Sequence, residues 1–229
     1  MRILDQAMEF VHFLGKWLLG IVRLLALRFD RSPFKTVNSV EEFVRTRSSY
    51  IAQTALFGYL KARMGTQFRV LFEDDVFSRE IRRAAARLFG SCLADLTFHV
   101  VCQCRLAGRM TDAEAAALAT RLFETGLERG LADYPDKDRQ VRMEATRRFN
   151  QRLVCINWIT AEDIYVTFAS SESDLVRFAP VVDEFKELDR EIVMNSIRFR
   201  WRDVREQARR RLDAPSVARD WREASHRQQ

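Results

Sequence analysis

The most apolar stretch of the chain is residues 10–29, FVHFLGKWLLGIVRLLALRF. Plotted at 100° per residue, the polar side chains and one glycine of this region fall within roughly 80° of one another, so about three quarters of the circumference is apolar. The residues of this stripe are Asp5, Glu9, His12, Lys16, Gly20 and Arg23. The pattern predicts an amphipathic helix over residues 1–30.

This helix suits the surface of a membrane better than its interior. Its longest charge-free run is six residues, WLLGIV, whereas a span needs about 20 mostly apolar residues, and each charge at the bilayer centre costs about 2.5–3.5 kcal/mol. Acidic residues near its start also disfavour a cleaved signal. We expect insertion into the membrane interface, and packing against other helices is the main alternative. The residues expected to contact the membrane are Lys16, Trp17, Leu18, Leu19, Ile21, Val22, Arg23, Leu24, Leu25 and Arg28.

Start and stop signals divide the rest of the chain into further helices. Capping boxes predict two of the starts, one from Ser39 and Glu42 and one from Thr111 and Glu114. Ser78 predicts a third. The predicted helices cover residues 39–65, 78–105, 111–130, 136–159 and 171–212, the last as one or two helices on either side of Pro180. Residues 162–171 fit either a strand or a helix end, because β-branched and aromatic residues crowd them.

Composition supports an all-α fold, a bundle of about six helices with the N-terminal amphipathic helix. Hydrophobic residues make up 47% of the 229 positions, enough for a core, whereas eight glycines and four prolines are few for a protein with many turns. We expect an amphipathic membrane-associating helix at 1–30, a helical body at 38–213 and a polar tail at 214–229. The four cysteines follow no disulfide spacing, which indicates a reducing, cytoplasmic compartment.

Positive charge is concentrated near the C-terminus. From residue 196 onward there are ten arginines against five acidic residues, within a chain whose net charge is +6. Such a segment attracts phosphate groups of lipids or nucleic acids, although it also fits a solvated helix face. The residues expected to meet an anionic partner are Arg198, Arg200, Arg202, Arg205, Arg209, Arg210 and Arg211.

The strongest chemical candidate is SCLADLTFHVVCQC, in which Cys92, Asp95, His99 and Cys102 lie on one helical stripe. Thiolate, carboxylate and imidazole groups all bind metals. Four positions spread over ten residues of one helix nevertheless span about 15 Å, too far for one ion. We therefore expect a core seam, in which Asp95 and His99 form a satisfied polar pair, rather than a metal site. No cofactor is expected.

Motifs of other catalytic classes are missing from the chain. It contains no Gly-x-Ser-x-Gly elbow, no Gly-rich phosphate loop, no Cys-x-x-Cys pair and no His-Glu-x-x-His pattern. Catalysis is therefore not the expected activity.

Two segments, FVRTRSSYIAQTALFGYLKARMGTQFRVLFEDDVF and LFGSCLADLTFHV, give the chain a resemblance to a group of uncharacterised bacterial helical proteins, some of which carry the automatic label "esterase". The resemblance covers roughly residues 38–100. It implies a helical fold and assigns no catalytic residue. The serine motif that the label implies is not found in this chain.

Together these patterns predict a helical scaffold or adaptor protein without catalytic activity, attached peripherally to the cytoplasmic face of the inner membrane. Its expected partners are an anionic membrane surface, an unidentified protein and a second copy of the chain. One alternative is a hydrolase or metal-dependent helical-bundle enzyme. Another is nucleic-acid binding through the basic C-terminal helix, which we do not expect because no nucleic-acid-binding motif accompanies it.

Overall fold

The computed structural model describes residues 32–65, 74–132, 139–158 and 167–227. The chain divides into two units, residues 1–32 and 33–229, and the second unit forms the helical body. The expected helix at residues 1–30 and its membrane-contacting residues lie outside the described ranges. The described residues form seven helices: α2 (Val37–Met64), α4 (Asp75–Ala107), α5 (Asp112–Gly130), α6 (Arg139–Cys155), α8 (Ala169–Phe178), α9 (Asp183–Arg211) and α10 (Ala214–His226).

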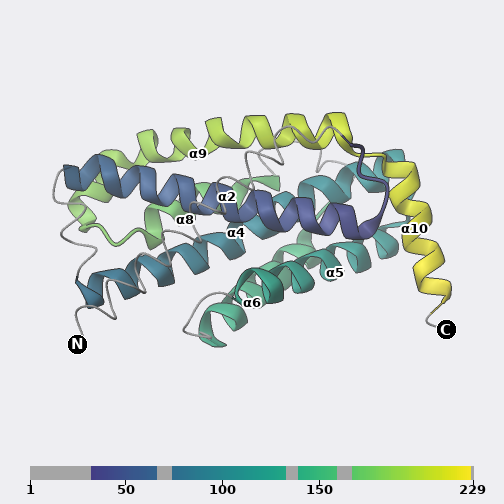
Figure 1. The fold of residues 1–229 in the computed structure, drawn as a ribbon, viewed down its shortest axis with the longest axis horizontal. Helices are drawn as coiled ribbons and strands as arrows, with labels where there is room; N and C mark the ends of the chain where they lie inside the picture. Colours follow the sequence, from purple (N-terminus) through teal and green to yellow (C-terminus); the bar gives the residue numbers. More distant parts are fainter. Residues whose placement is uncertain (1–31, 66–73, 133–138, 159–166, 228–229) are drawn as a thin grey trace. The chain divides into compact units, whose positions relative to one another are not determined.

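The predicted all-α bundle is confirmed (Figure 1). The described part has seven helices instead of about six for two reasons. The segment at 171–212 is interrupted around Pro180, where α8 ends at Phe178 and α9 begins at Asp183. In addition, the supposed polar tail forms a helix of its own, α10. The end of the ambiguous segment 162–171 belongs to α8, which begins at Ala169.

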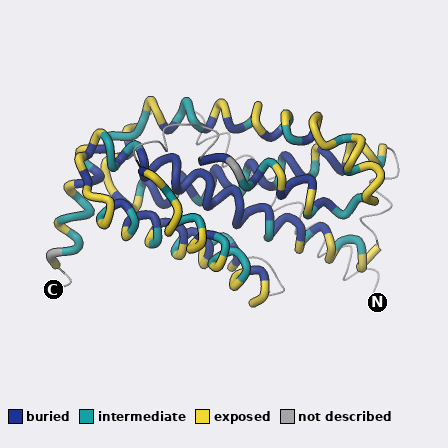
Figure 2. The backbone as a smooth tube through the Cα atoms, turned by 180° about the vertical axis from the view of Figure 1, so that it is seen from behind, coloured by how far each residue is buried: buried dark blue, intermediate teal, exposed yellow. Residues whose placement is uncertain are grey.

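Helix α4 is the centre of the body, and α2, α5, α6, α8 and α10 pack against it. Every residue from 88 to 102 is buried, so this part of α4 is covered around its whole circumference (Figure 2). The sequence LFGSCLADLTFHVVC fits this position because it contains few polar side chains. Among the described helices, only α4 is long and apolar enough to span a membrane, and 94% of its most apolar window is buried in the body.

The helix starts are partly as predicted. The capping box of Thr111 and Glu114 is confirmed, and α5 ends at Gly130 as expected. The box predicted at Ser39 and Glu42 is wrong, because α2 is capped three residues earlier by Thr36, whose hydroxyl accepts from the Ser39 backbone N–H. A helix has a single N-cap position, and in this segment two residues that often occupy it, Thr36 and Ser39, lie three positions apart.

The cap predicted at Ser78 is also wrong. Helix α4 begins one turn earlier, where the Asp74 carboxylate accepts from the backbone N–H groups of Val76 and Phe77. A carboxylate at this position satisfies two of the free N–H groups and complements the helix dipole.

The start of the body is joined to its C-terminal part. Phe34 forms a parallel β-bridge with Leu212; its N–H donates to the Arg211 carbonyl at 2.7 Å, and its carbonyl accepts from Asp213 N–H at 3.0 Å. The Asp220 carboxylate of α10 accepts from Val37 N–H, in the first turn of α2, at 2.8 Å. These bonds place the turn between α9 and α10 beside the beginning of α2 (Figure 1).

Helix α10 is ordered because it buries an apolar face, Ala214, Val217 and Ala218, against the body. It packs against the end of α4 at Gly108, the residue that follows the last position of that helix. A Cβ atom there would lie 2.8 Å from the Ala214 carbonyl oxygen and 2.8 Å from the Ala218 Cβ. The composition of residues 214–229 shows that they are mostly polar, but it does not show that Gly108 leaves room for them to pack against α4.

We predict that Gly108→Ala lowers the free energy of unfolding by about 1–3 kcal/mol, because the new methyl group pushes α10 away from α4. Gly58→Ala, in the exposed part of α2, is the control. There the nearest atom to a new Cβ belongs to the flexible Arg200 guanidinium, at 3.2 Å. Alanine is also more favourable than glycine within a helix, by up to about 1 kcal/mol. Urea unfolding of both variants measures the effect, and equal stability of the two would contradict this packing.

Candidate functional site

The most polar part of the interior surrounds Asp95, in the middle of α4. This side chain is fully buried. Its Oδ1 lies 2.5 Å from Arg152 Nη1 of α6, and its Oδ2 accepts from Ser171 N–H of α8 at 2.7 Å. Helix α8 has no side-chain cap of its own at Phe168. Asp95 therefore serves as an acceptor for the first turn of α8, where the free N–H groups and the helix dipole both favour an anion.

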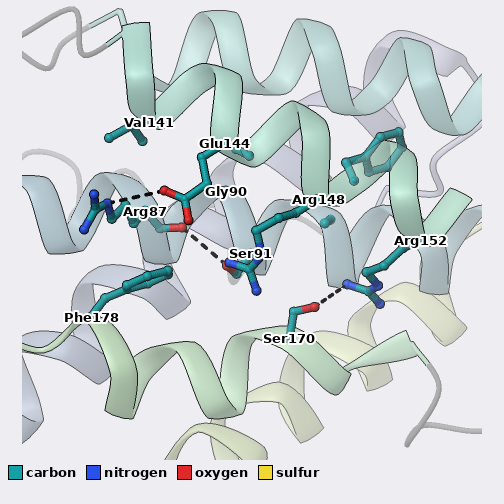
Figure 3. Close-up of a pocket in the computed structure, with 12 residues that line it drawn as sticks. Arg87, Gly90, Ser91, Val141, Glu144, Arg148, Arg152, Ser170 and Phe178 are labelled. Atoms are coloured by element: carbon teal, nitrogen blue, oxygen red, sulfur yellow. Dashed lines mark hydrogen bonds and ion pairs between the residues drawn. The ribbon is translucent and has the colours of Figure 1, made fainter.

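Arg152 joins three parts of the body. Besides Asp95, its Nη1 donates to Ser170 Oγ at 2.8 Å (Figure 3). Its Nη2 donates to the Thr167 carbonyl at 2.9 Å. The guanidinium also lies over the Phe98 ring, 4.8 Å from its centroid. Burial raises the pKa of Asp95 above its usual range, and the Arg152 charge and the Ser171 hydrogen bonds oppose this rise.

A second buried pair lies one turn away. Asp174 of α8 is almost fully buried, and its Oδ2 lies 2.6 Å from Arg148 Nη2 of α6. The same oxygen accepts from Ser91 Oγ of α4 at 2.6 Å. Farther along, Arg87 and Glu144 form a longer pair at 3.8 Å. Each of these arginines thus faces a carboxylate from another helix.

These pairs border a small hollow between α4, α6 and α8 (Figure 3). Its volume is about 20 Å³, with Arg87, Ser91, Glu144, Arg148, Arg152 and Phe178 among its lining residues. A hollow of this size holds about one water molecule. The arrangement is an ion-pair layer that holds three helices together.

The structure does not bring the four proposed metal ligands together. Cys92 is fully buried, which raises the pKa of its thiol well above the usual range. Cys102 Sγ donates to the Trp158 carbonyl at 3.3 Å. Among the described residues, no three His, Cys, Asp or Glu side chains form a group that could hold a metal ion.

His99 and Asp95 do not form the pair that the sequence suggested. His99 Nε2 lies 2.8 Å from Gln103 Nε2, whereas Asp95 pairs with Arg152. Burial and the nearby Arg205 charge lower the pKa of His99 to about 4. The imidazole is therefore neutral near pH 7, enclosed and far from the range of an effective general base.

The seven arginines expected to meet an anionic partner differ in their contacts. Three of them make contacts toward the body: Arg198 with Glu172 at 2.6 Å, Arg200 with the Thr54 carbonyl at 3.5 Å, and Arg205 over the Phe168 ring. The others are Arg202 beside Asp203, Arg209 and Arg210 with Glu206, and Arg211 over the Phe34 ring.

The sequence analysis missed Arg148, Arg152 and Asp174, which complete the buried pairs. A signal was present in the spacing. Polar residues recur every four positions at 87, 91 and 95 of α4, at 144, 148 and 152 of α6, and at 170 and 174 of α8. Such series lie along one face of a helix. Three polar series of this kind can meet in a bundle, although the sequence does not say which of them face one another.

No model of a known protein family matches the chain, and no curated protein and no solved structure matches it either. The resemblance to uncharacterised bacterial helical proteins therefore stays an expectation. Function has to be argued from the geometry of this chain alone.

We predict that Arg152→Ala destabilises the protein by about 3–5 kcal/mol, because it leaves the buried Asp95 charge without its guanidinium partner. Arg147→Ala, on the exposed side of the same helix, is the matched control and should change stability by less than about 0.5 kcal/mol. The double variant Asp95→Asn with Arg152→Met should recover part of the loss. Thermal and urea unfolding test this, and similar values for the two single variants would show that the pair is dispensable.

Stability should also depend on His99 between pH 6.5 and 4. Its pKa is lower in the folded protein than in the unfolded chain, so the unfolded chain binds more protons as the pH falls through this window. The stabilising effect of the neutral ring is complete above pH 6.5 and is lost toward pH 4, a change of about 3 kcal/mol. In His99→Gln, the free energy of unfolding should fall less over this range. If the free energy of unfolding fell equally with pH in the wild type and in His99→Gln, the burial of His99 would be contradicted.

Proposed function

We propose that the protein is a non-catalytic helical scaffold that associates peripherally with the cytoplasmic face of the inner membrane. The observation that carries this proposal is the β-bridge between Phe34 and Leu212. Phe34, next to the first residue of the body, thus lies beside the arginine-rich end of α9. The proposal is that the expected amphipathic segment before Pro33 and this basic end of α9 act on the same membrane surface.

Stable attachment to a membrane generally takes two signals, an apolar insertion and a second anchor such as a basic patch. Arg209 and Arg210 can provide the basic patch, since 71% of each side chain is exposed. Both contact Glu206, which reduces but does not cancel their charge. A cation close to an anionic membrane surface contributes about 1 kcal/mol.

The polar cluster supports the non-catalytic part of the proposal. Its carboxylates and arginines are engaged with one another, and the small hollow beside them takes about one water molecule. The three thiols of α4 are buried, and burial raises the pKa of Cys104 to about 12. These groups stabilise the fold and are poorly placed to act on a substrate.

We predict that the full-length protein floats with vesicles containing phosphatidylserine and that Arg209→Gln with Arg210→Gln weakens this binding about tenfold or more, because two of the interfacial cations are removed. The matched control, Arg121→Gln with Arg142→Gln, removes the same charge from exposed positions of α5 and α6 and should bind as the wild type does.

A further variant tests the apolar signal. Leu18→Asp with Leu25→Asp should abolish flotation while leaving the helical circular dichroism of the body unchanged. The proposal is wrong if the wild-type protein does not bind anionic vesicles. It is also wrong if the variants at Arg209 and Arg210 and at Leu18 and Leu25 all bind as strongly as the wild type.

A further inference from the structure

Helix α9 exposes a row of large apolar side chains on its outer face, where the Arg63 guanidinium of α2 lies over the Phe185 ring, 4.7 Å from its centroid. Phe185, Leu188, Ile192 and Phe199 are 44%, 74%, 73% and 60% exposed. They lie on the outer face of α9, opposite the residues that pack into the body, which are Val193, Ile197, Trp201, Val204 and Ala208. Exposed and buried positions alternate along this helix at the edge of the body (Figure 2). Contiguous exposed apolar surface of this kind usually marks an interaction site.

The spacing of the row is typical of a helix that pairs with another helix. The intervals of three, four and seven residues place all four side chains at the a and d positions of a heptad, with Asn195 filling the intervening d position. Such a narrow seam, two positions in seven, is the pattern of a coiled-coil contact. A helix that inserts into lipid has a much wider apolar face.

Charges beside the seam indicate what covers it. On the flank that corresponds to heptad position g, Glu184 and Glu191 occupy the N-terminal half of α9, and Arg198 and Arg205 occupy the C-terminal half. Two copies of α9 that run antiparallel bring g positions together. Glu191 then lies near Arg198 of the second copy, and Glu184 near Arg205 of the second copy.

A parallel pair lacks this match. It would bring Glu184 close to Asp189 of the second copy and Arg205 close to Arg210, two repulsive contacts, and Arg198 close to Asp203, an attractive one. Repulsive contacts therefore outnumber attractive ones. The antiparallel pair gives two attractive contacts, each repeated by the twofold axis, and such a self-complementary interface is what closed dimers require.

We propose that two copies of this chain form an antiparallel dimer through the outer faces of α9. In this register Leu188 lies opposite Phe199 of the second copy, and Ile192 lies opposite Asn195. Phe185 lies opposite Arg202 of the second copy, a cation–π pair like the one that Arg202 already makes with Phe199 of its own chain, at 4.5 Å. Within the monomer Arg198 pairs with Glu172 and Arg205 lies over the Phe168 ring, so the glutamates of the second copy approach arginines that also contact their own chain.

The interface is moderate in size. One helix from each copy buries less than the roughly 800 Å² per partner of a standard interface, so we expect a dimer that dissociates on dilution into the micromolar range. The dimer proposal is independent of the proposed membrane attachment, which relies on residues 1–30 and on Arg209 and Arg210.

Sedimentation equilibrium of the full chain, over concentrations from about 1 to 100 μM, tests the proposal. We expect a monomer–dimer equilibrium for the wild type and a dissociation constant at least tenfold higher for Leu188→Glu with Ile192→Glu. The control, Val76→Glu with Val154→Glu, adds the same charges at exposed apolar positions of α4 and α6 and should dimerise as the wild type does. Monomeric wild-type protein overturns the proposal, as does a dimer that the α9 variant does not weaken.

Disulfide trapping tests the orientation, in a Cys155→Ser background that removes the exposed native thiol. A mixture of Leu188→Cys and Phe199→Cys chains should cross-link to each other, and neither variant alone should form dimers. Efficient cross-linking of Leu188→Cys with itself would show a parallel pair and overturn the antiparallel arrangement. If the wild type is monomeric and Leu188→Glu with Ile192→Glu abolishes vesicle flotation, lipid covers the seam and the dimer proposal is wrong.

Discussion

The body is organised around a carboxylate that has no access to water. Asp95 lies on the covered part of α4, where an unpaired charge would cost several kcal/mol. Its two oxygens are satisfied by the first turn of α8 and by Arg152 of α6, so both helices have to approach α4 at this level. Ser171, whose N–H binds Asp95, accepts at its hydroxyl from the indole of Trp201 in α9. One buried charge thus constrains four helices, and hydrophobic burial supplies most of the driving force around it.

The sequence predicted the kind of elements well and their exact starts less well. Helix α5 is recovered at both ends because its capping box and its terminal glycine are local features. The starts of α2 and α4 are displaced by about one turn, since Thr36 and Ser39, or Asp74 and Ser78, are all acceptable caps when only local sequence is considered. Helix α10 was missed because its order depends on a surface at the end of α4 that is formed by the fold.

The polar cluster around Asp95 also shows that local sequence does not reveal contacts between helices. Asp95 was found because a carboxylate within an apolar helix stands out, but its partner was assigned to His99 on the same stripe. The actual partner, Arg152, is 57 positions away in the sequence, and Ser171 is 76 away. Side chains at i and i+4 share a face, yet they do not bond when other helices offer stronger partners. Tertiary contacts of this kind cannot be read from the periodicity of one helix.

Helix α9 has an inner face that packs into the body and an outer face with exposed apolar side chains. Its inner face supplies Ile197 and Trp201 to the core, and polar residues on the outer face would serve the isolated body equally well. Leucine and isoleucine that stay exposed add nothing to folding and increase the tendency to associate. Arg198 and Arg205 on the flank also contact Glu172 and Phe168 of their own chain. The heptad spacing of the exposed row, in contrast, has no explanation within the monomer. It has a simple one if the same helix in a second copy runs in the opposite direction, because the same distribution of charge then favours that register and disfavours the parallel one.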